Sequence, residues 1–104
     1  MPARIIDHDS IEPTAIEHRR DDVYHGDMLE QTYNYLLYHF ESDGAYFFAR
    51  AYLDDIGTVS LHGPFESRAQ LRPTGAPLSE RVLAYLRRRF RTIQVLQASG
   101  YLSI

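Results

Sequence analysis

The sequence contains no cysteine, no lysine and no tryptophan. Without cysteine the chain can form no disulfide, no thiolate metal site and no cysteine nucleophile. It has no apolar run of the roughly 18 residues that a membrane-spanning helix needs. Its first ten residues, MPARIIDHDS, lack the continuous apolar segment of a secretory signal. We therefore expect a soluble, cytoplasmic protein.

Known catalytic and nucleotide-binding motifs are also missing. The chain has no G-x-S-x-G, no P-loop and no glycine-rich dinucleotide turn. Its five histidines show neither HxxxH nor HExxH spacing, so we predict no metal site and no cofactor. These absences leave open whether the protein is an enzyme.

The charged residues are unevenly distributed. Thirteen of the fourteen acidic residues lie within residues 1–66, whereas seven of the eleven arginines lie within residues 67–104. The two parts of the chain should therefore attract each other. At 104 residues the chain has the length of a single domain. We expect residues 26–104 to form that domain, after a flexible acidic arm over residues 1–25 whose few apolar side chains cannot offset its ordering entropy.

Residues 45–65 predict a β-hairpin. Side chains alternate across a strand, so one face of its first strand would carry Phe47, Ala49, Ala51 and Leu53, and the other Tyr46, Phe48, Arg50 and Tyr52. Residues 54–57 supply a turn in which Gly57 can take a positive φ. Val59 and Leu61 point inward on the second strand, which we expect Gly63 and Pro64 to end. Both faces of the first strand are therefore largely apolar.

One helix is predicted before the hairpin in the sequence and a second helix after it. Residues 27–41 carry apolar side chains at the spacing of an amphipathic helix, at Leu29, Tyr33, Leu36, Leu37 and Phe40. A second helix begins after Ser79, a good N-cap residue, and ends in a run of arginines. Alternating β-branched residues predict a strand from Thr92, although residues 99–101 also resemble the C-terminal cap of a helix. The expected fold is therefore α+β, ordered αββα with a C-terminal strand, the helices packing on an antiparallel hairpin-based sheet.

Aromatic residues are the most specific signal for function. Nine of the thirteen lie between residues 24 and 52, more than one helix and one hairpin face can bury against each other. Tyrosines with buried rings and solvated hydroxyls are typical of interfaces and clefts. We predict a non-catalytic binding module, a homodimer, that meets another copy or a partner protein through Tyr35, Tyr38, Tyr46, Phe48, Arg50 and Tyr52. In the competing interpretation, the second helix covers the tyrosine side of the hairpin and buries these rings inside one chain.

Two other functions stay open. A small enzyme or small-anion binder would use a pocket around His39, Arg50 and His62, because a histidine beside an arginine can do acid–base work on an anion. Nucleic-acid binding would use Arg87, Arg88 and Arg91 on the second helix. A sequence pI of about 5.9 argues against nucleic acid as the partner.

Overall fold

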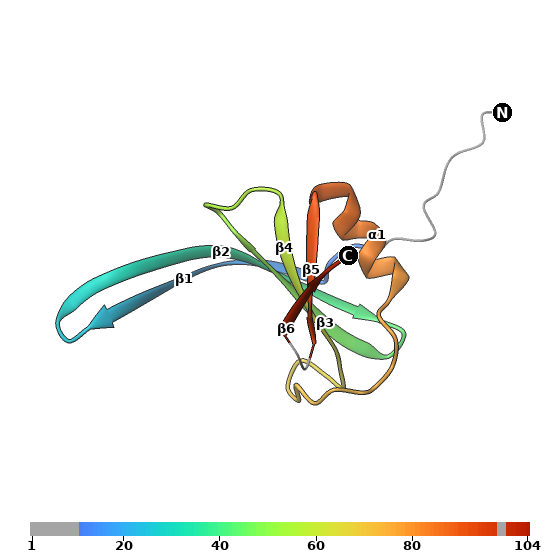
Figure 1. Cartoon of the computed structure of the whole chain (residues 1–104). Coiled ribbons are helices and arrows are strands. Elements are labelled where there is room, and N and C mark those ends of the chain that lie inside the picture. The colour runs from blue at the N-terminus through green and yellow to red at the C-terminus, as the bar shows by residue number, and fades with distance from the viewer. Residues whose placement is uncertain (1–10, 98–99) are drawn as a thin grey trace.

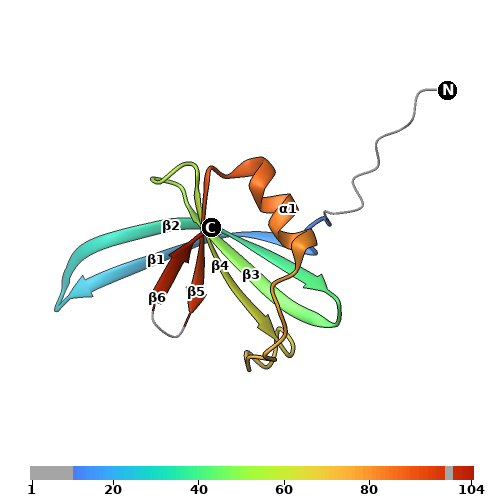
Figure 2. The same ribbon diagram turned by 45° about the vertical axis from the view of Figure 1, so that its right-hand side comes forward.

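The computed structural model describes residues 11–97 and 100–104, with the backbone alone for Gln97 and Tyr101. Within them the chain forms, in order, β1 Ala15–His25, β2 Met28–Ser42, β3 Ala45–Tyr52, β4 Thr58–Phe65, α1 Glu80–Arg89, β5 Thr92–Gln97 and β6 Gly100–Ser103 (Figures 1 and 2). The strands make one six-stranded sheet in sequence order. The predicted αββα fold is therefore wrong, because the described chain is mostly sheet with one helix.

The connections explain where the helix lies. Neighbouring strands are antiparallel except β4 and β5, which run parallel. A parallel pair needs a long crossover connection, and the chain between β4 and β5 contains α1. The helix packs against one face of the sheet, at the β2 and β5 strands (Figure 1). We term the opposite side of the sheet, which points away from α1, the far face.

The helix predicted over residues 27–41 is wrong, because this stretch forms β2. Its side chains are largely apolar on both faces of a strand, so they satisfy a helical spacing as well. Aromatic residues also favour strands. Toward the core point Leu36, Tyr38 and Phe40, and toward the far face point Tyr35, Leu37 and His39. A strand with apolar residues on both faces therefore has the same spacing of apolar residues as an amphipathic helix.

The turn after β2 decides between strand and helix. Ser42 pairs with Ala45, so Asp43 and Gly44 alone join β2 to β3. Both have positive φ, 56° and 76° respectively. That is the pattern of a type I′ hairpin turn, for which Asp-Gly is a preferred sequence. A helix that ended with Gly44 as its C-terminal cap would have required only one such residue.

The predicted hairpin is confirmed as β3 and β4, with Gly57 at a φ of 99° in their connection. Phe47, Ala49 and Ala51 point into the core as expected. Leu53 does not, because it lies past the end of β3 and is 49% exposed. The predicted stop at Gly63 and Pro64 is also wrong, since β4 continues through both residues.

The second predicted helix is confirmed as α1. The Ser79 side chain accepts a hydrogen bond from the Val82 N–H and caps the helix, and three arginines occupy its last turn. The strand predicted from Thr92 is confirmed as β5. No helix in residues 11–97 and 100–104 has the length and apolar character to cross a membrane.

Residues 15–25, within the stretch where we expected a flexible acidic arm, form β1. This strand pairs with β2 along its whole length. Residues 1–10 of the same stretch lie outside the described residues. β1 is an edge strand, and its charged side chains are typical of edges that resist pairing with further strands.

The core lies between α1 and the sheet. Val82, Leu83 and Leu86 of the helix are buried. They face side chains of β2 to β5 that are themselves at most 2% exposed: Phe40, Phe47, Ala49, Val59, Leu61 and Ile93. Because α1 covers this face, the polar and aromatic residues predicted to form a site can lie together only on the far face.

Candidate binding site

The far face collects seven of the eight residues predicted to form an interface or a binding site. They come from β2, β3 and β4: Tyr35, His39, Tyr46, Phe48, Arg50, Tyr52 and His62. The ring centroids of Tyr35 and Tyr52 are 5.5 Å apart, and those of Phe48 and His62 are 4.5 Å apart. The structure therefore brings these seven residues into one surface.

Tyr38, the eighth residue, lies on the opposite face. Its ring meets those of Tyr85 and Phe90 edge-on, at centroid distances of 6.2 and 5.9 Å. Residues three apart share a face of a helix but lie on opposite faces of a strand. A helix over residues 27–41 would place Tyr38 beside Tyr35, whereas the strand turns Tyr38 into the core.

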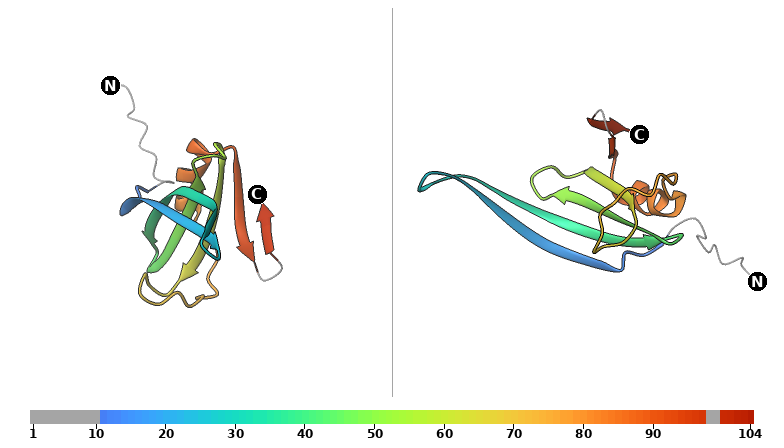
Figure 3. Two further views of the ribbon diagram at one scale, coloured as in Figure 1. Left: turned by 90° about the vertical axis from the view of Figure 1, so that its left-hand side faces the viewer. Right: turned by 90° about the horizontal axis from the view of Figure 1, so that it is seen from below.

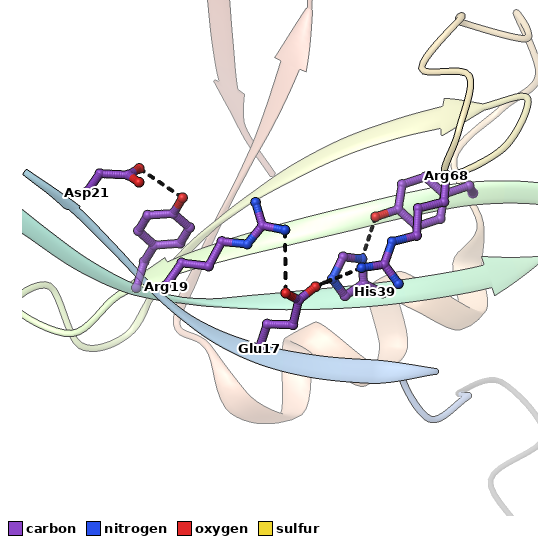
Figure 4. A network of polar contacts seen from close by, with 7 residues as sticks. Glu17, Arg19, Asp21, His39 and Arg68 are labelled. Carbon is purple, nitrogen blue, oxygen red and sulfur yellow. Dashed lines mark hydrogen bonds and ion pairs between the residues drawn. The ribbon is translucent and has the colours of Figure 1, made fainter.

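A chain of hydrogen bonds crosses the far face from β1 to β3 (Figure 4). Buried His39 stands in the middle: its Nδ1 lies 2.5 Å from the Tyr46 hydroxyl, and its Nε2 contacts Glu17 Oε1. An ionised carboxylate only accepts hydrogen bonds, so Nε2–H donates to Glu17, and in a neutral ring Nδ1 accepts from Tyr46. The bond to His39 lowers the pKa of Glu17, and burial raises the pKa of Tyr46.

Glu17 also positions two arginines. Arg68 Nη2 donates to Glu17 Oε1 at 2.8 Å, and Arg19 Nη2 donates to Glu17 Oε2 at 3.4 Å (Figure 4). Both guanidinium groups are about half exposed, so solvent screens each pair and neither adds much to stability. The bond to Arg68 holds the loop after β4 against β1. The main consequence of the two contacts is that Glu17 keeps both guanidinium groups beside the far face.

Arg50 is held by aromatic side chains. Its Cζ lies 4.9 Å from the centroid of the Tyr35 ring, and its Nη1 donates to the Tyr52 hydroxyl at 3.3 Å. The Tyr35 hydroxyl in turn donates to Asp21 Oδ2 at 2.9 Å. Burial raises the pKa of Tyr35, so its hydroxyl stays a donor. A guanidinium fixed in this way loses less entropy on binding a ligand.

Phe48 and His62 form the aromatic part of the face. Their rings are parallel within 5°, and Phe65 also stacks on Phe48, at a centroid distance of 5.9 Å. Burial lowers the pKa of His62, and the nearby Arg50 charge lowers it further. His62 is therefore a neutral stacking partner at neutral pH.

These residues enclose a cleft of about 280 Å³ on the far face. It is lined by three arginines, by two polar members of the hydrogen-bond chain and by three apolar side chains: Arg19, Arg50, Arg68, His39, Tyr46, Leu37, Phe48 and Leu71. His62 stacks behind Phe48 and does not line the cleft. The pocket predicted around His39, Arg50 and His62 is thus built from the first two residues and from partners in β1 and the loop.

The chemistry of the cleft favours anions. Three guanidinium groups surround it, and Glu17 is the carboxylate that two of them contact. No group of three or more histidine and acidic side chains in the described residues could hold a metal ion. The arginines predicted for nucleic acid, Arg87, Arg88 and Arg91, line a different hollow at the end of α1.

Sequence reasoning missed Glu17, Arg19 and Arg68. The first two, with Asp21, lie at every second position of β1, so a strand period over residues 15–25 would have placed them on one face. Arg68 shows no such signal, because the fold brings it to Glu17 across 51 residues of sequence.

Comparison with known proteins gives no relative: no family model, curated protein or solved structure matches this chain.

Proposed function

We propose that the protein is a small, non-catalytic binding protein that holds an organic carboxylate in the far-face cleft. The observation that carries this proposal is the convergence of Arg19, Arg50 and Arg68 on one cleft. They come from β1, β3 and the loop after β4. Guanidinium groups bind carboxylates through paired, charge-assisted hydrogen bonds, so the cleft offers an anion several donors at once.

The apolar walls indicate the rest of the ligand. Leu37, Phe48 and Leu71 line the cleft together with the arginines. A ligand with a carboxylate at one end and an aromatic or aliphatic body would satisfy both kinds of wall. The cleft volume of about 280 Å³ lies near the lower end of the range for ligand pockets and suits a small metabolite.

The hydrogen bonds of His39 favour binding over catalysis. A general base must be able to reach a proton of the substrate. Both ring nitrogens of His39 are engaged, one with Tyr46 and one with Glu17. Tyr46 has a raised pKa, so its phenol is a hydrogen-bond donor and a weak nucleophile. We therefore assign these groups to shaping the cleft.

The burial of the tyrosines bears on the homodimer predicted through this face. Tyr35 and Tyr46 are each only 4% exposed within one chain. A stable interface needs about 800 Å² from each partner, and rings that are already buried contribute little to that area. A ligand in the cleft uses the same residues without this requirement.

Calorimetric titration tests the proposal. The probes are benzoate and hexanoate, with benzamide as a neutral analogue of benzoate. We expect saturable binding of a carboxylate and a loss of about tenfold or more in Arg50→Gln and Arg68→Gln, since a hydrogen bond to a charged group contributes about 1.5–3 kcal/mol. Arg72→Gln is the matched control, because Arg72 is exposed and pairs with Glu66 at 3.8 Å, outside the cleft lining.

Two results would overturn the proposed function. One is equal binding of benzoate and benzamide, since charge recognition would then play no part. The other is carboxylate binding that survives in both cleft variants at the level of Arg72→Gln.

A further inference from the structure

The β1–β2 hairpin extends well past the rest of the sheet (Figures 1 and 3). The last bond from β3 to β2 joins the Leu53 N–H to the Asn34 carbonyl. Residues 21–33, which we term the ribbon, therefore have only each other as strand partners within the described residues. Six strand residues span about 20 Å. An isolated two-stranded ribbon is only marginally stable in water. A ribbon of this length would therefore gain stability from a further contact.

The ribbon exposes apolar side chains toward its tip. Their exposed fractions are 39% for Val23, 59% for Tyr24, 76% for Met28 and 49% for Leu29. Exposed apolar side chains beside charges are typical of interaction surfaces. The ribbon thus has apolar groups available to bury.

The ribbon is also acidic. Residues 21–33 contain four carboxylates and neither arginine nor lysine. Asp21 accepts a bond from Tyr35, and Asp22 pairs with Arg20 at 3.0 Å, so these two are held at its base. Asp27 and Glu30 flank the exposed apolar residues near the turn. A partner of this tip must be basic and partly apolar.

A hollow on the same chain has those properties. It has a volume of about 600 Å³ and lies between the β3–β4 turn and the junction of α1 with β5. Its lining includes four arginines and two apolar side chains: Arg87, Arg88, Arg89, Arg91, Ile56 and Phe90. Ile56 is 93% exposed. The positive charge of this hollow therefore complements the negative charge of the ribbon tip, and both surfaces carry apolar side chains.

The ribbon and the hollow lie at the same end of the sheet. The β3–β4 turn follows Leu53, whose N–H bonds to the carbonyl of Asn34, the residue next to the ribbon. In the right panel of Figure 3 the ribbon projects past this turn. In a two-fold dimer each surface of one copy meets the complementary surface of the other. A two-fold axis at this end would place each ribbon on the hollow of the other copy, so both contacts form at once and the assembly closes.

We propose that the ribbon of one chain binds the arginine hollow of a second copy, reciprocally, in a closed dimer. The Arg87–Glu80 pair competes only weakly with this contact, because it is 3.7 Å long and both side chains are more than half exposed. Arg89 lies over the Tyr85 ring at 3.8 Å, which leaves its charge uncompensated by a carboxylate in that contact. Neither the ribbon nor the hollow shares a residue with the lining of the far-face cleft, so this dimer can hold or fail independently of the proposed function.

Complementary charge reversals test the dimer by sedimentation velocity. The ribbon variant is Asp27→Arg with Glu30→Arg, and the hollow variant is Arg87→Glu with Arg91→Glu. At micromolar concentration we expect the wild type at twice the chain mass of 12.1 kDa and each variant alone as a monomer. An equimolar mixture of the two variants should regain the dimer mass, because both of its contacts then join opposite charges. Glu41→Arg with Glu66→Arg, two exposed acids outside the ribbon, is the control and should stay dimeric.

The proposal is overturned by a monomeric wild type, by variants that stay dimeric, or by a mixture that stays monomeric while both variants show native circular dichroism. A monomeric wild type that retards an oligonucleotide at low salt, and loses this in the hollow variant, would assign the arginines to nucleic acid.

Discussion

At the scale of the residue, Gly63 lies where the sheet leaves no space for a side chain. Its φ is 127°, a conformation that side-chain-bearing residues rarely adopt. A Cβ there would stand 2.9 Å from the Tyr46 carbonyl oxygen and 2.9 Å from Phe47 Cδ2. The register between β3 and β4 shifts at this same place. Glycine is therefore required by both conformation and space.

Gly63→Ala should destabilise the protein more than Gly26→Ala. Gly26 also has a positive φ, 64°, but nothing lies within 4 Å of its added Cβ, so its alanine variant should lose about 1–2 kcal/mol from conformation alone. Gly63→Ala should lose about 1–3 kcal/mol more, through overpacking against Tyr46 and Phe47. Urea unfolding of both variants measures the difference, and equal losses would contradict this account.

His62 makes stability depend on pH. Burial lowers its pKa below the ordinary value of 6.5, so below that pH the unfolded chain takes up a proton that the folded chain resists. The unfolded state then binds more protons, and the free energy of unfolding falls as the pH falls. The stabilisation is complete above 6.5 and is lost as the pH drops toward the lowered pKa.

Replacing this histidine should remove that part of the pH dependence. We expect His62→Phe, which keeps a ring to stack on Phe48, to show a flatter stability profile than the wild type below the ordinary pKa. The measurement is the free energy of unfolding in urea over a pH series. Parallel profiles for the two proteins would show that His62 does not carry this dependence.

At the scale of the element, α1 closes the core of a sheet whose two faces differ. Leu86 is fully buried between the helix and the strands. Most helical stability in proteins comes from such packing, since a ten-residue helix is marginal alone. The helix therefore depends on its apolar stripe more than on its arginine-rich end.

Leu86→Ala should lower the free energy of unfolding by about 2–5 kcal/mol, through lost burial and the cavity that remains. Leu102→Ala, in β6, is the matched control, because that side chain is 49% exposed. Its loss should be well below that of Leu86→Ala. Similar losses for the two variants would mean that α1 does not seal the core.

At the scale of the whole molecule, the sheet separates into a packed body and a projecting ribbon. The core side chains come from β2 beyond the ribbon, from β3 to β5 and from α1. The ribbon contributes the Tyr33–Tyr52 ring contact, with centroids 6.0 Å apart, the bond from Tyr35 to Asp21 and the exposed pair of Asp22 with Arg20. The body should therefore fold without it.

Replacement of residues 21–33 by a two-residue Asn-Gly turn should leave a cooperatively folding, monomeric protein. The turn would join Arg20 to Asn34, which already pair across the strands, and its sequence suits a hairpin. We expect a loss of about 1–3 kcal/mol from the missing Tyr33–Tyr52 ring contact and Tyr35–Asp21 bond. Thermal unfolding followed by circular dichroism, with sedimentation for mass, checks both parts. A chain without a cooperative transition would show that the ribbon is part of the folding unit.

Local chemistry determined the elements that the sequence predicts by itself. Alternation specified the β3–β4 hairpin and which of its side chains enter the core, and Ser79 specified the start of α1. These features depend on neighbours a few residues apart, so they can be read along the chain.

Tertiary structure alone decided the identity of β2 and the composition of the site. Residues 33–40 are apolar on both faces, so their period fits a helix or a strand, and pairing with β1 and β3 selects the strand. That choice separates Tyr38 from Tyr35. It also brings Glu17 to His39 and to Arg68, contacts that span 22 and 51 residues of sequence. Strand pairing joins distant segments, and no local period records which segments will meet.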